Sequence, residues 1–359
     1  MNLAEDVLQT PSLTQPFNPC TYPPKKRKYY YALPPCLNMD LFSTMLLLLA
    51  GFVILIKSAE YAVKALVHIA AFFGLSQFTI SFLVVGIASV LPEFSIAVNS
   101  ALSGNSAFGL GVLFGSNVAD LSIVIGLVAI YAGKIKVHSK IITGNFYYYL
   151  MLILLPVLLL LDGGLSRFDG LALILAFAFY MKIIMQQRRS FSKSVEGISK
   201  SKWKFAKNLV IGAAAVGVLF LSADIVANNS IALAAALSVP AIFVGIIIAL
   251  GTCLPELTFS IEAVREKKQE LGLGDILGNV ATDATLSIGV VALIMPINPP
   301  QMAIALLSGF SMIIFGILTI HFLKTERHLV RKEGYLFVLL YLVFMAAQFA
   351  LESGIINMR

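Results

Sequence analysis

The amino-acid sequence predicts an all-α integral membrane protein whose ten transmembrane helices form two five-helix repeats of inverted topology. Three observations predict this fold class. The chain of 359 residues is 58% hydrophobic and 13% charged, with a mean hydropathy of +0.89, whereas soluble domains are about 25% charged. Long segments carry no charge at all. Acidic residues recur at a nearly fixed spacing in the two halves of the chain.

Uncharged runs locate the membrane spans. Residues 94–119, 225–255 and 284–323 contain no Asp, Glu, Lys or Arg, and each run exceeds the roughly 18 residues that indicate a spanning helix. Alternating barrel strands would not give such runs. In chain order we expect helices at 41–67, 77–102, 106–132, 142–161, 168–187, 207–236, 240–264, 273–295, 301–322 and 335–352.

The chain is therefore divided into four parts. Residues 1–38 are polar and proline-rich, which is typical of a disordered N-terminal extension. They lack a signal-peptide pattern, so we expect either that Met39 is the true start or that the extension is dispensable. The first repeat spans 39–187, a basic cytoplasmic loop rich in Ser, Lys and Arg spans 188–206, and the second repeat spans 207–359.

The lysines and arginines favour one side of the membrane. The loops after the third, fifth, seventh and ninth predicted helices hold 17 of them, and the opposite side holds 6. The positive-inside rule places the first group in the cytoplasm and both termini outside. We expect a multi-pass protein of the cell membrane, and a monomer is compatible with the sequence. The net charge of +7 follows from these loops and does not indicate a nucleic-acid partner, so the expected surroundings are the lipid bilayer.

Three pairs of acidic residues indicate the internal repeat. Three acids of the first half recur 164, 163 and 163 residues later, giving the pairs Glu60 and Asp224, Glu93 and Glu256, and Asp120 and Asp283. The neighbouring sequence agrees, because SVLPEFSIA aligns with TCLPELTFS. Since each half has an odd number of helices, the second half must enter the membrane from the opposite side. Inverted repeats of this kind are typical of secondary transporters.

Four of these acids have an oxygen-bearing residue four positions earlier, on the same helix face. The pairs are Ser89 and Glu93, Ser116 and Asp120, Thr252 and Glu256, and Asn279 and Asp283. A cage of oxygen ligands suits hard cations such as Ca²⁺ and Na⁺. The histidines lie at helix ends or in loops, so we expect none of them to bind a metal. No cofactor is predicted, because the ions are transported substrates.

Prolines precede two of the acids directly. Pro92 and Pro255 have no N–H to offer the carbonyl four residues back, which leaves the carbonyls of Ala88 and Gly251 without that donor. Within a membrane such a carbonyl needs protein, water or an ion as a partner. A kinked helix with a free carbonyl beside a carboxylate is therefore a candidate cation site.

Glu60 and Asp224 are weaker candidates. Lys57 and Lys64 lie three residues before and four residues after Glu60, so an ion pair along one helix is at least as good an explanation there. Asp224 has no such neighbour, and neither acid is assigned to the cation site.

The two Pro-Glu helices, each followed by a GSN-like helix, resemble the α-repeats of the calcium/cation antiporter superfamily, the sodium/calcium exchangers. The resemblance covers about 41–352. It implies an ion site in the second, third, seventh and eighth helices, and alternating access in which the first and sixth helices slide across that core. By position, Glu93 and Glu256 resemble the central Ca²⁺ ligands, supported by Ser89 and Thr252. Asp120 and Asp283 correspond to the acidic or amide position of the third and eighth helices, and Ser116 and Asn279 fall where the family often has serine.

The sequence departs from the resemblance at positions that bear on the counter-ion. The family pattern GTSxPE is kept in the second half as GTCLPE, with Cys253 in place of serine, and the first half has Val90 there. In the exchangers these serines are implied sodium ligands. Asp120 adds a carboxylate where many relatives have asparagine. Four carboxylates would place a charge of −4 against the +2 of Ca²⁺, so we expect at least one to bind a proton. Sodium is the predicted counter-ion, and a proton is the alternative.

Two other classes of function compete with a Ca²⁺ antiporter. A cation channel could use the same oxygen-lined pathway, but inverted repeats around a midplane site favour a carrier. An intramembrane enzyme is disfavoured, because the sequence has no H-E-x-x-H pair and no histidine near the acids. The sequence therefore predicts a transporter rather than an enzyme.

Overall fold

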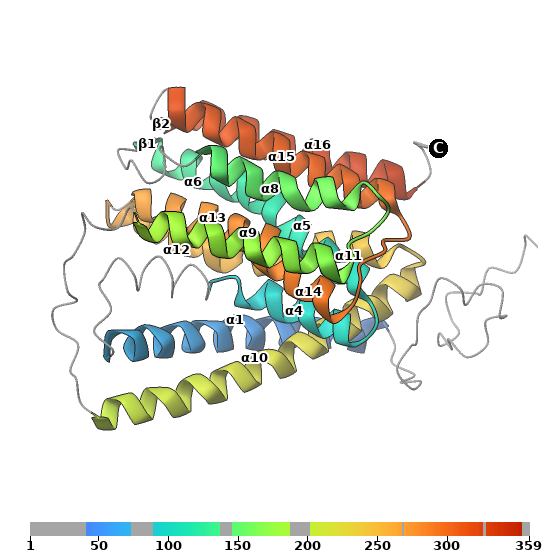
Figure 1. The fold of residues 1–359 in the computed structure, drawn as a ribbon, viewed down its shortest axis with the longest axis horizontal. Coiled ribbons are helices and arrows are strands. Elements are labelled where there is room, and N and C mark those ends of the chain that lie inside the picture. The colour runs from blue at the N-terminus through green and yellow to red at the C-terminus, as the bar shows by residue number, and fades with distance from the viewer. Residues whose placement is uncertain are drawn as a thin grey trace, which may run out of the picture.

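The structure is a computed structural model that describes residues 41–72, 89–136, 146–186, 202–267, 269–325 and 328–353. Its elements are almost all helical (Figure 1). In chain order they are α1 (Leu41–Phe72), α4 (Leu91–Leu102), α5 (Ser106–Ala119), the π-helical turn η4 (Asp120–Val124), α6 (Ile125–Ala132), β1 (Lys134–Lys136), α8 (Phe146–Leu160), α9 (Arg167–Gln186), α10 (Lys202–Leu237), α11 (Ala241–Thr252), α12 (Leu254–Arg265), α13 (Gln269–Thr282), the π-helical turn η6 (Asp283–Ser287), α14 (Ile288–Ile294), α15 (Met302–Thr325), β2 (His328–Val330) and α16 (Arg331–Glu352).

The described helices confirm an all-helical membrane fold. Seven segments in the described ranges are long and apolar enough to cross a membrane, and Tyr147–Leu160 is a shorter apolar helix. Large apolar side chains such as Phe42 and Leu221 point outward, with exposed fractions of 74% and 70%, as lipid-facing positions do. The predicted span at 77–102 is described only from residue 89. The count of ten spans stays a prediction, and the 1–38 extension lies outside the described residues.

A short two-stranded ribbon accompanies the helices. β1 pairs antiparallel with β2, with Lys134 opposite Val330 and Lys136 opposite His328. These strands lie in two loops that the charge distribution assigns to one side of the membrane, and their pairing requires that they share a side. Leu165 and Ile297 form a similar antiparallel bridge between two loops assigned to the other side.

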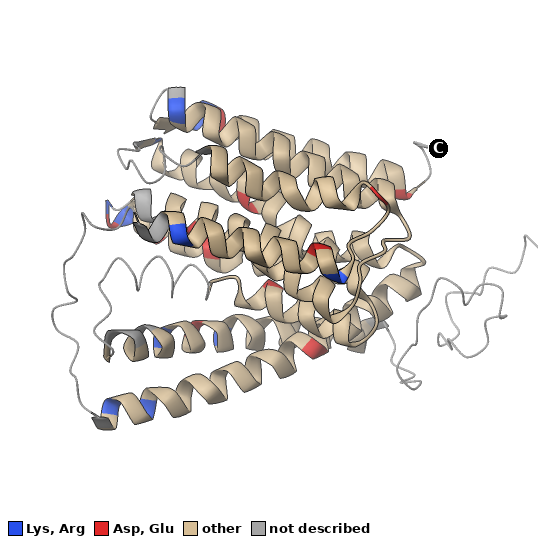
Figure 2. Ribbon diagram, in the orientation of Figure 1, with Lys and Arg blue, Asp and Glu red and all other residues tan. Residues whose placement is uncertain are grey.

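The helices run roughly along one direction (Figure 1). α1 and α10 lie side by side along one edge of the bundle, and α15 and α16 lie along the opposite edge. Most of the lysines and arginines gather at one end, whereas several acids lie along the length of the helices (Figure 2). We name this the basic end, defined by Arg265, Lys324 and Arg331. α12 and α15 finish there, and α13 and α16 begin there.

Glycines allow two close helix crossings related by the repeat spacing. α6 crosses α16 where Gly126 meets Gly334, and a Cβ built on Gly126 would lie 2.8 Å from the Gly334 carbonyl oxygen. α14 crosses α9 where Gly289 meets Gly170, and a Cβ built on Gly289 would lie 2.7 Å from the Gly170 carbonyl oxygen. In both crossings one half of the chain packs against the other. The two crossings are related by nearly the same spacing as the paired acids.

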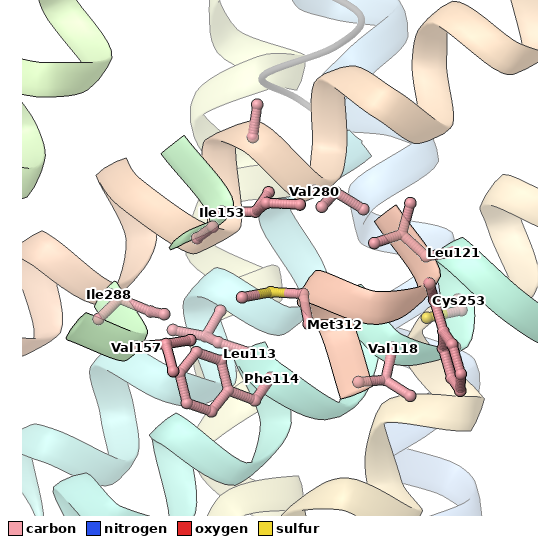
Figure 3. Close-up of a cluster of buried hydrophobic side chains, with 14 of the residues drawn as sticks. Leu113, Phe114, Val118, Leu121, Ile153, Val157, Cys253, Val280, Ile288 and Met312 are labelled. Atoms are coloured by element: carbon pink, nitrogen blue, oxygen red, sulfur yellow. The ribbon is translucent and has the colours of Figure 1, made fainter. Parts of the chain in front are cut away.

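Buried apolar side chains fix the helices that carry the acids. Phe114 of α5, Val157 of α8, Val280 of α13 and Met312 of α15 lie in one cluster (Figure 3). The side chain of each is buried, and between helices in a membrane such contacts stabilise through van der Waals packing. The polar residues one or two positions away on α5 and α13 are thereby held in the interior.

Candidate functional site

The acids of the predicted site are all buried. Glu93, Asp120, Glu256 and Asp283 each expose only 1% of their surface. Glu93 lies in the first turn of α4 and Glu256 in the first turn of α12, directly after the prolines. The structure therefore places the four predicted carboxylates inside the protein, where each ionised group needs compensating partners.

The second proline marks a break within a membrane span. α11 ends at Thr252, Cys253 forms a turn, and α12 begins at Leu254 with Pro255 as its second residue. Gly251 lies at this break and packs against the ring of Phe52 from α1, where a Cβ added to the glycine would lie 3.0 Å from that ring. In the first half, Pro92 is likewise the second residue of α4. Ala88, whose carbonyl is the other predicted cation ligand, lies outside the described residues.

Each aspartate begins a π-helical turn. Asp120 opens η4 and Asp283 opens η6, and in each case the amide five residues later donates to the aspartate carbonyl. Ser122 and Thr285, which are also 163 positions apart, donate their hydroxyls to the carbonyls of Val118 and Ala281. π-helical turns occur frequently at functional sites. The sequence prediction missed them because an inserted residue shifts the faces of a helix, and a span that is apolar on most faces gives no periodic pattern in which that shift can be seen.

Hydrogen bonds connect the predicted residues across the two halves. The Ser116 hydroxyl of α5 donates to Asp283 Oδ2 at 3.1 Å. The Ser89 hydroxyl, just before α4, donates to Asn279 Oδ1 at 2.6 Å, and Asn279 Nδ2 donates to Glu256 Oε1 at 3.3 Å. The structure thus brings five of the predicted site residues into contact.

Two predicted residues are placed less directly. The Thr252 side chain is buried, but its hydroxyl donates to the Ala249 carbonyl of its own helix at 3.0 Å. Glu93 interacts electrostatically with Asp283, Glu256 and Asp120. The acid of α4 therefore lies in the same charged cluster as the other three.

Several carboxylate oxygens in this cluster lack a hydrogen-bond donor. Within the described residues, Glu93 Oε2, Glu256 Oε2 and Asp120 Oδ1 are buried and have no hydrogen-bond partner. An unsatisfied buried acceptor costs about 1–3 kcal/mol, and more when it is charged. A cation would compensate both the missing bonds and the repulsion between the carboxylates.

The donor set decides which cations fit. No three His, Cys, Asp or Glu side chains in the described ranges converge on a single metal position. Carboxylates here are instead interleaved with hydroxyl and amide oxygens from Ser89, Ser116 and Asn279. A mixed oxygen set of this kind suits hard cations such as Ca²⁺ and Na⁺.

The two departures from the exchanger pattern are buried. Val90 and Cys253 each expose 3% of their surface. The Cys253 thiol lies 3.7 Å from the Ser116 carbonyl oxygen, beside the apolar cluster (Figure 3), and it interacts with Asp120. Neither residue supplies a hard oxygen ligand to the site.

Sequence reasoning missed one buried acid. Asp275 of α13 exposes 9% of its surface, and its Oδ1 lies 3.4 Å from the Ser89 hydroxyl. Its position near the start of the predicted helix 273–295 made it resemble a helix-end residue. The signal that could have found it is its spacing, because Asp275, Asn279 and Asp283 follow one another at intervals of four on one helix face.

The remaining acids lie apart from the site. Glu60 forms an ion pair with Lys57 at 3.0 Å on the exposed surface of α1, as the alternative interpretation proposed. Asp224 accepts a hydrogen bond from Asn228 at 2.9 Å on the exposed surface of α10. His68 and His321 are also exposed, which agrees with their exclusion as ligands.

Comparisons with known proteins agree with the fold. The chain is 27% identical to the inner membrane protein YrbG of Escherichia coli over 259 residues, covering 70% of this chain and 79% of YrbG. It is 23% identical to the sodium/calcium exchanger MaX1 of Methanosarcina acetivorans over 343 residues, covering 85% and 98% of the two chains. A solved structure of the sodium-calcium exchanger NCX_Mj has the same fold, with a TM-score of 0.59, 24% identity, and coverage of 86% and 99%. The profile of the sodium/calcium exchanger protein family matches residues 43–186 and 207–350, and the chain therefore belongs to that family.

Proposed function

We propose that this protein exchanges Ca²⁺ for Na⁺ by alternating access at the buried carboxylate cluster. The observation that carries the proposal is the set of buried carboxylate oxygens on Glu93, Glu256 and Asp120 that have no donor among the described residues. These acids come from both halves of the chain, as a site at the interface of two repeats requires. We name Glu93, Asp120, Glu256 and Asp283 the carboxylate site.

The remaining predicted ligands complete the proposed site. Ser89, Ser116 and Asn279 hydrogen-bond to the carboxylates or to one another, and they would supply neutral oxygens to a dehydrated ion. The break at Pro255 frees the Gly251 carbonyl from its helix bond, and Thr252 lies beside it. Together these groups can supply the six to eight oxygen ligands that Ca²⁺ takes in proteins.

Charge balance makes the exchange possible. An empty site would leave several carboxylates repelling one another in a low dielectric, which is costly. Either Ca²⁺ or several monovalent cations would relieve the repulsion. The transporter should therefore change between its two access states only with a cation bound at the site. α1 and α10 lie beside this core as a pair, which suits the sliding movement that the resemblance implies. We further propose a cell-membrane location with the basic end in the cytoplasm.

Protons are the second candidate counter-ion. The observation that favours them is the chemistry of Val90 and Cys253, which stand buried where sodium-binding serines are expected. With fewer hydroxyl oxygens for Na⁺, carboxylates can still exchange Ca²⁺ for protons, which need no ligand cage.

Proteoliposome flux tests the proposal. Vesicles loaded with Na⁺ should take up Ca²⁺ from a Na⁺-free medium, and vesicles loaded with choline should not. If a pH gradient drives Ca²⁺ uptake equally well without Na⁺, the sodium version is wrong and the proton version holds. If neither gradient drives uptake, the antiport proposal itself fails.

A further inference from the structure

Asp275 breaks the two-fold pattern of the carboxylate site. The position 163 residues earlier is Val112, whose side chain is fully buried in an apolar cluster with Phe108 and Val244. The four acids of the carboxylate site form two pairs, and each pair has one member in each half of the chain. Asp275 has no equivalent in the first half. Any role that it has must therefore act on one side of the site only.

The side on which Asp275 lies follows from its helix. α13 begins at the basic end, just after Arg265 and Lys267. It ends at Thr282, and Asp283 follows directly as the first residue of η6. Asp275 therefore lies two helical turns nearer the basic end than Asp283. Val112 precedes Asp120 by the same two turns in the oppositely directed α5, and so lies toward the other end of the bundle.

A continuous chain of polar groups joins Asp275 to the carboxylate site. Its Oδ1 lies 3.4 Å from the Ser89 hydroxyl, which lies 2.6 Å from Asn279 Oδ1. The amide nitrogen of Asn279 then donates to Glu256 Oε1 at 3.3 Å. The other oxygen of Glu256 is buried without a partner in the described residues, so the chain ends at an acceptor that can bind a cation.

Electrostatic interactions lead to the same connection. Asp275 acts on both Glu256 and Asp120, although it belongs to neither proline-marked helix. A divalent cation near Ser89 and Asn279 would therefore be attracted by Asp275 before it reached the carboxylate site. The oxygens of these three residues could hold it together with water, as hard cations permit.

We infer that Asp275, Ser89 and Asn279 form an additional binding step for the divalent cation on the basic side of the carboxylate site alone. The inference rests on the proposed antiport function. It adds that the affinity for Ca²⁺ differs between the two sides of the membrane. The transporter should bind Ca²⁺ more tightly from the basic side than its paired acids alone would allow. On the opposite side, where Val112 stands, the cation meets the carboxylate site without this step.

Side-resolved kinetics test the inference. Initial Ca²⁺ exchange is measured against Ca²⁺ concentration in right-side-out and inside-out membrane vesicles, for the full chain and for Asp275→Asn. The half-saturating Ca²⁺ concentration should rise about tenfold on the basic side, the change that about 1.4 kcal/mol produces, and stay within about twofold on the other side. Asp275→Val, which copies the first half, should give the same result. Asp224→Asn, an exposed acid on α10, serves as the matched control and should change neither side.

Two results would overturn the inference. An equal rise on both sides would make Asp275 a general structural residue, and no rise on either side would remove it from the pathway. Because Asn keeps an oxygen for the Ser89 hydroxyl, Asp275→Asn is expected to fold even where Asp275→Val does not. If the unsubstituted protein exchanges Ca²⁺ but Asp275→Asn has no effect confined to one side, only this inference fails. If the unsubstituted protein does not exchange Ca²⁺ at all, the proposed function itself fails.

Discussion

Adding one methyl group at Gly289 should strain the crossing between α14 and α9. A Cβ on Gly289 would lie 2.7 Å from the Gly170 carbonyl oxygen and 2.8 Å from Ile174 Cγ1. Ordinary contacts begin at 3.4 Å, so the helices must separate by about 0.7 Å, the difference between these distances. Both closest atoms belong to a packed helix, so neither can rotate away freely.

The magnitude of the effect follows from packing. Overpacking a tight interior position costs about 1–3 kcal/mol, while replacing glycine by alanine within a helix gains up to about 1 kcal/mol. Gly217→Ala measures that gain alone, because a Cβ at Gly217 would meet nothing within 4 Å. The difference between Gly289→Ala and Gly217→Ala therefore isolates the cost of the crossing, at about 1–3 kcal/mol.

Thermal unfolding in detergent measures this difference. Gly289→Ala should unfold several degrees below Gly217→Ala, since each kcal/mol shifts the midpoint by about 2 °C or more. Gly126→Ala should behave like Gly289→Ala, because its Cβ would lie 2.8 Å from the Gly334 carbonyl oxygen. If Gly289→Ala and Gly217→Ala unfold together, the two helices do not cross as closely as described. If only one crossing is sensitive, the paired architecture is refuted.

Three further substitutions test separate parts of the account. Val90→Ser restores a hydroxyl at a buried position and should strengthen the Na⁺ dependence of Ca²⁺ uptake; an unchanged Na⁺ titration would remove this residue from counter-ion choice. Glu60→Gln should leave transport within about twofold, because the exposed pair with Lys57 contributes only about 0–1 kcal/mol; loss of flux would show a role for the Glu60 carboxylate that the structure does not indicate. Gln348→Met removes the bonds that Gln348 Nε2 donates to the Ser308 hydroxyl at 2.7 Å and the Ile304 carbonyl at 3.1 Å. It should cost less than about 1 kcal/mol in thermal stability, because Ser308 keeps its bond to the Ile304 carbonyl at 3.0 Å and no buried group loses its last partner; a large drop in midpoint would contradict that reasoning.

Much of the fold could be predicted because membrane spans have a strong composition signal. The predicted helix at 106–132 corresponds to the combined α5, η4 and α6, and that at 240–264 to α11 and α12. Charge patterning also placed the loops of β1 and β2 on one side. The ribbon itself could not be predicted, because three-residue strands are too short for a recognisable alternating pattern and form only when two distant loops meet.

The site shows a similar division. The spacing of Glu93, Asp120, Glu256 and Asp283 identified the acids, since ionisable groups in apolar segments are rare. Which groups touch depends on tertiary packing, so the bonds of Ser89 to Asn279 and of Ser116 to Asp283 were not foreseeable. Asp275 has no repeat partner, because Val112 stands 163 residues earlier, so the spacing of the paired acids does not identify it.

The central claim is that one buried carboxylate site, shared by both halves, carries the exchanged cation. Its most direct test is radiolabelled Ca²⁺ exchange in proteoliposomes containing Glu256→Gln, with Glu262→Gln as the control. Glu262 lies on the same helix but is exposed and paired with Arg265 at 3.3 Å. Two unit charges 4 Å apart interact by about 4 kcal/mol at an effective dielectric near 20. Removing the charge of the Glu256 carboxylate beside a bound divalent cation should therefore lower exchange more than about a hundredfold. We expect Ca²⁺ exchange to fall to background in Glu256→Gln and to persist in Glu262→Gln. Normal exchange in a correctly inserted Glu256→Gln protein would contradict the account.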